Sequence, residues 1–222
     1  MRRSINPALI AALLLVPGAA GAGVIRGHVR VVTALPPAPM THSAYFGRAR
    51  ELPVTPPTVR GLVSDAVVYI EDAPASAESL QRATEPLPVL AQKGQAFVPR
   101  VLPIPVGAVV DMPNFDRVYH NVFSLSPIRS FDLGRYPMGQ SRRVRFDRPG
   151  LVNVFCDIHS NMAAFVLVLS HPLITRPGLN GAFALPPLPP GHYTLHVWHP
   201  DLPPWRGDVE VGDKPAEVEV TL

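Results

Sequence analysis

The fold is decided by residues 150–162, which read Gly-Leu-Val-Asn-Val-Phe-Cys-Asp-Ile-His-Ser-Asn-Met. A Pro-Gly turn signal opens this stretch, and apolar residues then alternate with other residues. Because neighbouring side chains on a strand face opposite ways, Cys156 should point into the core together with Val152 and Val154. A short loop follows before the next apolar run at 163–170. The pattern therefore predicts two buried strands joined by a loop that begins at the cysteine.

The loop carries three side chains that bind soft metal ions. Cys156, His159 and Met162 offer a thiolate, an imidazole and a thioether within seven residues. Thiolate and thioether ligands favour copper over magnesium, calcium or manganese, and two His, one Cys and a weak axial Met are the ligands of a blue-copper site. The second histidine must come from elsewhere. His120, at the start of an apolar strand over 121–125, is the best candidate.

Each of these residues also has a simpler interpretation. A lone Cys is more often a buried structural thiol than a ligand, and the chain has a single Cys, which cannot form an internal disulfide. His120 could be a core histidine with satisfied hydrogen bonds, and Met162 could fill a gap in the core. Met138 is then the fallback axial ligand. The combined spacing of the four residues is what favours copper.

Three short motifs carry a family resemblance. The tripeptide His120-Asn121-Val122, the Cys156-x-x-His159-x-x-Met162 spacing and the strand over 150–152 together resemble cupredoxins, with a short amicyanin-like ligand loop. The resemblance spans about residues 60–170 and extends to secreted methylamine-utilisation-type and plastocyanin-like proteins. It implies one type 1 (blue) copper ion with His120, Cys156, His159 and Met162 as its ligands.

Two further residues are expected to tune the metal from outside the ligand set. Many cupredoxins have Pro before the loop histidine, whereas this chain has Ile158. Ile158 keeps a backbone N–H that can donate to the Cys156 sulfur, and Asn121 resembles the family residue that supplies another such bond. Hydrogen bonds around the sulfur tune the reduction potential. We therefore expect a higher potential than in an Ile158→Pro variant, and equal or reversed potentials in electrochemistry would contradict this.

The rest of the chain predicts an all-β protein. The 28 Pro among 222 residues disfavour long helices, and short apolar runs separated by turns favour a β-sandwich. The resemblance sharpens this to a cupredoxin-like Greek-key β-sandwich over 61–170. Residues 171–222 loosely resemble a small carboxypeptidase-regulatory-like β module, which is expected to pack against the first domain or borrow the N-terminal strand. Strands are also predicted over 24–32 and 66–71, and a short helix over 76–82.

The N-terminal residues are typical of a secretory signal peptide. Arg2 and Arg3 precede a short apolar run and an Ala-Gly-Ala sequence at 20–22, so cleavage is expected to leave Gly23 first. The alternative is an uncleaved anchor. Removal of residues 1–22 lowers the net charge from +3 to +1, and no basic run with aromatics supports nucleic-acid binding. The segment 23–60 is then an N-terminal strand followed by a Pro-rich loop.

These patterns favour an electron carrier of the periplasm or the secreted fraction, with a redox partner protein and no membrane span after cleavage. An enzyme is not expected, because four ligands leave no open metal position and no hydrolase or phosphate-binding motif is present. The alternative is a non-redox module that delivers copper or mediates adhesion. His171, His192, His196 and His199 are interpreted as surface or turn residues rather than a second metal site.

Overall fold

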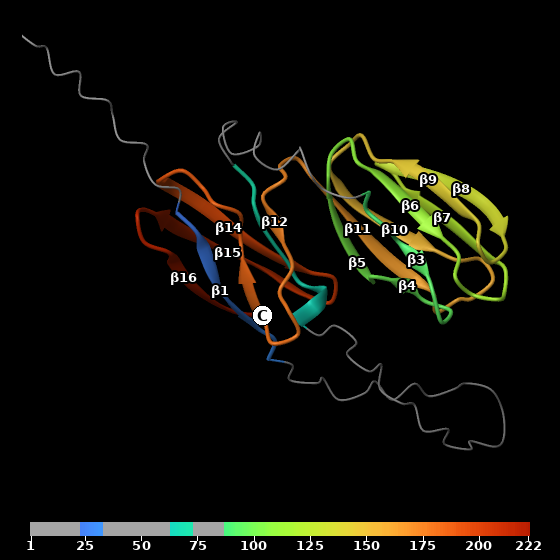
Figure 1. Cartoon of the computed structure of the whole chain (residues 1–222), viewed down its shortest axis with the longest axis horizontal. Helices are drawn as coiled ribbons and strands as arrows, with labels where there is room; N and C mark the ends of the chain where they lie inside the picture. The colour runs from blue at the N-terminus through green and yellow to red at the C-terminus, as the bar shows by residue number, and fades with distance from the viewer. Residues whose placement is uncertain (1–22, 33–62, 73–86) are drawn as a thin grey trace, which may run out of the picture.

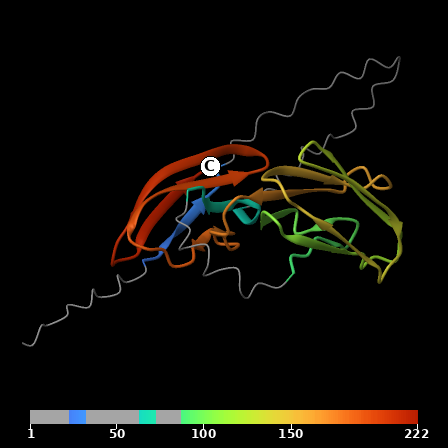
Figure 2. The same cartoon turned by 90° about the horizontal axis from the view of Figure 1, so that it is seen from above.

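The structure, a computed structural model, describes residues 23–32, 63–72 and 87–222. Within these ranges the protein is all-β: the described residues contain strands and one short 3-10 helix, η1 (Val63–Asp65), and no α-helix. Two β lobes lie side by side in both views (Figures 1 and 2). The central lobe comprises residues 87–170. The composite lobe combines residues 23–32, 63–72 and 171–222. The expected all-β sandwich class is confirmed.

The central lobe is built on a sheet whose strand order in the described chain is β5-β11-β10-β7-β8. The pairs β6–β9 and β3–β4 lie against it, and a core that includes Val122, Val154 and Phe146 fills the interior. The strands of this lobe are β3 (Ala91–Gln92), β4 (Phe97–Val98), β5 (Val101–Pro105), β6 (Val109–Pro113), β7 (His120–Ser126), β8 (Arg129–Tyr136), β9 (Ser141–Arg145), β10 (Gly150–Phe155) and β11 (Ala163–Leu169).

The composite lobe has its own apolar core beneath two sheets, ordered β13-β1-β16 and β12-β2-β14-β15 among the described residues. β1 lies in the middle of the first sheet, antiparallel to β13 and parallel to β16. The N-terminal strand therefore completes a lobe made mainly from the C-terminal residues, which is one of the two arrangements expected for this segment. The strands are β1 (Ile25–Arg30), β2 (Val67–Ile70), β12 (Ile174–Thr175), β13 (Ala182–Ala184), β14 (Gly191–His199), β15 (Leu202–Val211) and β16 (Ala216–Thr221).

Apolar and charged contacts join the two lobes. A small buried cluster at the junction includes Val67 from the composite lobe and Val101 and Leu167 from the central lobe. Arg100 lies at the junction too, and its guanidinium contacts Asp65 at 2.8 Å and Asp201 at 2.9 Å. The two sandwiches thus meet along β5 and β11 of the central lobe.

Several expected elements differ in detail from the structure. The strand expected over 66–71 is β2, which pairs with β12 and β14 of the composite lobe rather than with the copper-loop strands. Its pairing partners, which lie more than 100 residues away, determine this membership. The leader, residues 33–60 and the helix expected over 76–82 lie outside the described residues. No helix in the described ranges is long and apolar enough to cross a membrane.

Candidate metal centre

Three side chains from two parts of the central lobe meet at one end of its sheet. His120 is the first residue of β7 and is fully buried. Cys156 directly follows β10 and is also buried, on the same side of the strand as Val152 and Val154, as its parity predicts. His159 lies in the loop between β10 and β11 and is partly exposed. Because β7 and β10 are paired neighbours, their ends bring the two buried side chains together.

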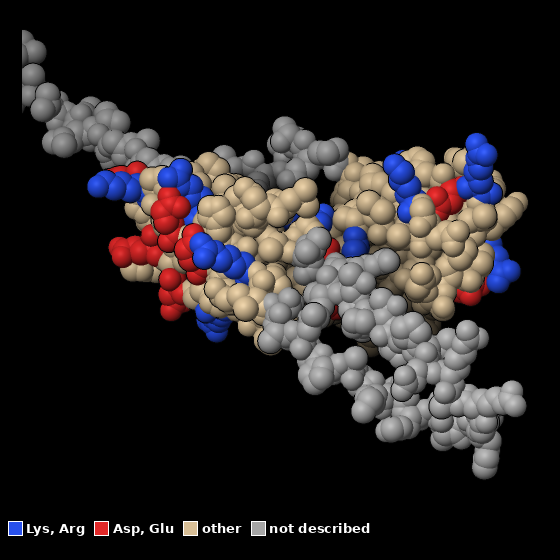
Figure 3. Space-filling view, turned by 90° about the horizontal axis from the view of Figure 1, so that it is seen from below, with Lys and Arg blue, Asp and Glu red and all other residues tan. Residues whose placement is uncertain are grey.

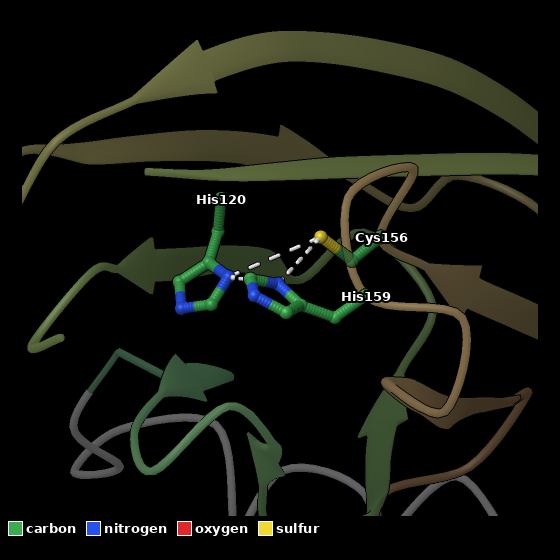
Figure 4. A group of neighbouring side chains, drawn as sticks. All are labelled: His120, Cys156 and His159. Carbon is green, nitrogen blue, oxygen red and sulfur yellow. Dashed lines mark hydrogen bonds between the residues drawn. The ribbon is translucent and has the colours of Figure 1, made fainter. Parts of the chain in front are cut away.

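The potential ligand atoms form a compact triangle (Figure 4). His120 Nδ1 lies 3.1 Å from His159 Nδ1, and Cys156 Sγ lies 3.9 Å from the former and 3.8 Å from the latter. In the described part of the chain, these three residues are the group of His, Cys, Asp and Glu side chains close enough to hold a metal ion. The structure therefore brings together three of the four ligands predicted from the sequence.

The size and chemistry of the triangle fit one metal ion. Metal–nitrogen bonds of about 2 Å and metal–sulfur bonds of about 2.3 Å, the values for zinc, allow N···N separations up to about 4 Å and N···S separations up to about 4.3 Å. All three observed separations are shorter than these limits. A single ion can therefore contact all three atoms, and a thiolate with two imidazoles suits copper or zinc.

Met162 lies at the far end of the same loop. It is buried in the core cluster that contains Cys156, and its backbone closes the loop. The N–H of Cys156 donates to the Met162 carbonyl (3.2 Å), and the N–H of Met162 donates to the His159 carbonyl (3.0 Å). Met138, the alternative axial ligand, is largely exposed in the turn between β8 and β9. Burial and loop position therefore favour Met162 over Met138.

Asp116 is a functional candidate that the sequence reasoning missed. Its carboxylate lies 2.9 Å from His120 Nε2 and accepts the backbone N–H groups of Gly94 (2.6 Å) and Gln95 (2.8 Å). Partial burial opposes ionisation of Asp116, but these backbone bonds and the contact with His120 outweigh it and hold its pKa below the usual value. The available signal was an acidic residue four positions before the candidate ligand.

The two residues predicted to tune the sulfur show a different pattern of contacts. The side-chain amide of Asn121 donates to Asp132 at 2.7 Å, and its Oδ1 is buried without a hydrogen-bond partner among the described residues. Ile158 is exposed beside His159. The Cys156 sulfur contacts the two imidazoles, and hydrogen bonds to it from Ile158 and Asn121 stay predictions.

The remaining histidines of the C-terminal segment do not gather into a second metal group within the described ranges. The interpretation as surface or turn residues is wrong for His199, which is almost fully buried at the end of β14. Its Nδ1 accepts the backbone N–H of Asp201 at 3.1 Å, in the turn that follows β14. His196 is largely covered because its ring stacks on Tyr69, with centroids 5.1 Å apart.

No protein-family model matches the chain, and no curated protein matches it. Solved structures that resemble part of the chain include a copper-containing nitrite reductase and cupredoxins. A copper-containing nitrite reductase from Thermus scotoductus is 30% identical over 39% of this chain, with a TM-score of 0.36. The chain covers 23% of that enzyme, less than a quarter of its length.

Two smaller structures are covered almost completely. A mutant of amicyanin in the Cu(I) form is 19% identical, and the match covers 47% of this chain and 98% of amicyanin, with a TM-score of 0.36. A purple cupredoxin from Nitrosopumilus maritimus is 24% identical, and the match covers 36% of this chain and 95% of that protein, with a TM-score of 0.32.

Proposed function

We propose that the chain is an electron-transfer protein with one type 1 copper ion, acting in the periplasm or outside the cell. The observation that carries this proposal is the convergence of His120 Nδ1, His159 Nδ1 and Cys156 Sγ at separations of 3.1–3.9 Å. When bound, copper would supply the one-electron change between Cu(I) and Cu(II). Met162 is the proposed weak axial ligand, as in blue-copper sites.

The scaffold suits a carrier that changes little between oxidation states. His120 and Cys156 adjoin paired strands, and the ligand loop is closed by the two backbone hydrogen bonds that involve Met162. Because paired strands and a closed loop hold the ligand residues, the ligand atoms have little freedom to move when the charge on the metal changes. This rigidity favours fast electron exchange over chemistry that needs an open coordination position.

The surface around the exposed ligand suits transient contact with a redox partner. Phe115 and Tyr119 expose 58% and 57% of their surface in the loop that precedes His120, and Val118 and Ile158 are also exposed. Exposed apolar residues that cluster beside a site mark interaction surfaces. Seen from below, the central lobe is mainly uncharged, with charged residues at its edges, whereas acidic and basic residues both gather on the composite lobe (Figure 3). We propose that the partner docks over His159.

The test is a visible spectrum of residues 23–222 after addition of Cu(II), beside a Cys156→Ser variant. The variant keeps the size of the side chain but replaces the soft thiolate with a hydroxyl. We expect an intense blue charge-transfer band that the variant lacks, and repeated bleaching and recovery of the band on reduction and oxidation with the metal retained.

Two outcomes would overturn the proposal. A colourless protein that binds zinc or no metal would leave Cys156 as a structural or zinc-bound thiol. A coloured protein that passes its copper to an acceptor chelator on reduction would favour copper delivery, the non-redox alternative.

A further inference from the structure

The buried candidate ligand His120 contacts an acidic side chain through the ring nitrogen that faces away from Cys156 and His159. Its Nε2 lies 2.9 Å from the Asp116 carboxylate, while its Nδ1 faces Cys156 and His159. His120 is 0% exposed, and the Asp116 side chain is only 15% exposed. Since water competes little for this contact, the hydrogen bond is stronger than it would be at the surface.

The position of Asp116 is itself fixed by the backbone around it. Its two oxygens divide their contacts, because Oδ1 accepts the Gly94 N–H whereas Oδ2 accepts the Gln95 N–H and faces His120. The turn that presents these N–H groups has positive φ at Gly94 (66°) and at Gln95 (56°). A non-glycine residue in that region is uncommon. The turn is therefore shaped to aim two donors at one carboxylate.

Asn114 holds the loop from the other side. Its Oδ1 accepts the backbone N–H of Asp116 at 2.8 Å, and its Nδ2 donates to the carbonyls of Val118 and Tyr136. Asn114 is fully buried and uses its amide oxygen and nitrogen in this way. The segment 114–119 is thereby held rigid just before His120, and Asp116 has little freedom to leave the imidazole.

A carboxylate at Nε2 determines which nitrogen of His120 carries the proton. An ionised carboxylate only accepts hydrogen bonds, so Nε2 must be the donor and the lone pair of a neutral ring must lie on Nδ1. Nδ1 is the atom that faces the other two ligands. His159 Nδ1 lies 3.1 Å away and can donate to this lone pair when its own ring carries a proton there.

From this geometry we infer that Asp116 is a positioning residue, which acts through His120 and keeps its Nδ1 free to bind the metal. The inference rests on the proposed copper site. The negative carboxylate also makes Nδ1 of the imidazole a stronger electron-pair donor to the metal. This stabilises Cu(II) more than Cu(I), because the ion of higher charge is bound more strongly by a more basic ligand. Asp116 therefore lowers the reduction potential of the centre.

The first test is the protonation pattern of the histidine rings, measured by long-range proton–nitrogen NMR on the metal-free full chain. We expect His120 to be protonated at Nε2, and the Asp116→Ala variant to lose this preference. A wild-type His120 protonated at Nδ1 would overturn the inference. This readout needs no copper, so it decides the inference even if the blue band is absent and the proposed function fails.

The second test compares copper affinity and reduction potential in Asp116→Asn and in the matched control Asp157→Asn. Asp157 adjoins Cys156 but is exposed and paired with Arg135 at 3.0 Å, so its removal changes the net charge equally without touching His120. For Asp116→Asn we expect Cu(II) affinity to fall about 10- to 100-fold. Each tenfold loss of Cu(II) affinity that is not matched by a loss of Cu(I) affinity raises the reduction potential by about 59 mV.

The control should change Cu(II) affinity by less than about twofold, because exposed charges are screened. Equal changes of copper affinity and reduction potential in the two variants would show that Asp116 acts only through its charge and would overturn the inference. If Asp116→Ala or Asp116→Asn fails to fold, as judged by the amide spectrum of β7 and β10, the wild-type ring protonation alone decides the question.

Discussion

The two lobes follow the same β-sandwich plan, but they treat polar side chains differently. In the composite lobe, β1 alternates buried and exposed residues along its whole length, and β14 does so almost as regularly. In the central lobe, β7 begins with three consecutive buried residues, His120, Asn121 and Val122. A register shift in the pairing of β7 with β8 follows at Asn121–Phe123. The irregular strand is the one that carries a candidate ligand.

This difference shows where the chain departs from what a stable sandwich needs. Among the described residues, the buried polar side chains of the central lobe are Gln92, Asn114, His120, Asn121, Ser124 and Ser126, whereas those of the composite lobe are Asp65 and His199. Burying polar groups costs free energy unless they are hydrogen-bonded. Such exceptions are found mainly at functional sites. Among the described residues, those of the central lobe surround the three side chains that could hold a metal ion.

The largest effect is expected from Gly27→Ala in the composite lobe. A Cβ at position 27 would lie 1.8 Å from the Val218 carbonyl oxygen of β16, so the parallel pairing of β1 with β16 must break. We expect a loss of about 3 kcal/mol or more and loss of hydrogen-exchange protection in β1, β13 and β16. The blue band should persist if the central lobe folds on its own.

Gly212→Ala is the matched control, because nothing lies within 4 Å of the added Cβ. It should leave thermal unfolding nearly unchanged. Simultaneous loss of the band and of both lobes in Gly27→Ala would show that the central lobe does not fold without the composite lobe.

An intermediate effect is expected from Arg100→Gln at the junction. The Asp65 side chain is only 9% exposed, and loss of Arg100 leaves its carboxylate poorly solvated and without this partner. We expect destabilisation of about 1–3 kcal/mol by denaturant unfolding. Arg143→Gln, which removes an exposed pair with Asp111 inside the central lobe, should cost at most about 1 kcal/mol. Equal destabilisation by the two variants would show that the Arg100 contacts stabilise the protein no more than an exposed ion pair does.

A smaller change in stability is expected from Met162→Leu, which nearly conserves the buried volume. The cost should stay below about 1.5 kcal/mol, whereas the reduction potential of the copper-loaded protein should rise because a weak donor to the oxidised metal is lost. Cyclic voltammetry measures the shift, and Met138→Leu is the control at an exposed site. An unchanged potential in Met162→Leu together with a shifted potential in Met138→Leu would indicate Met138, and not Met162, as the axial ligand.

The smallest effect is expected when the pH is lowered and the Arg100–Asp201 contact at the junction is weakened. The hydrogen bond from Arg100 lowers the pKa of Asp201 below 3.8, against the opposing effect of burial. A lowered folded-state pKa stabilises the protein at pH values above 3.8 and loses this contribution as the pH falls through the folded value. The Tm difference between wild type and Arg100→Gln should therefore be constant near neutral pH and shrink below 3.8. A difference that grows in acid would contradict this.

Much of the fold was predictable because strand periodicity is local. The strands that carry Cys156 and follow His120 were expected within a residue or two of their observed ends. β8 was not expected, although Phe131 and Leu133 alternate with small or polar residues and pack against the core of the central lobe. The end of β15 was indicated by Val209 and Val211, but its beginning was not expected, because prolines follow its first residue. Proline is tolerated there because β15 is an edge strand, whose outward N–H groups need no partner in the sheet.

The sequence by itself determined the all-β class, the inward direction of Cys156 and the loop that holds His159 and Met162 near it, because these follow from side-chain alternation and short spacing. Only the tertiary structure decided that Asp116 lies behind His120, that Asn121 bonds Asp132, and that β1 and β2 complete the composite lobe. These contacts depend on the pairing of segments that are distant in the chain or on how one loop folds, and side-chain periodicity does not record either.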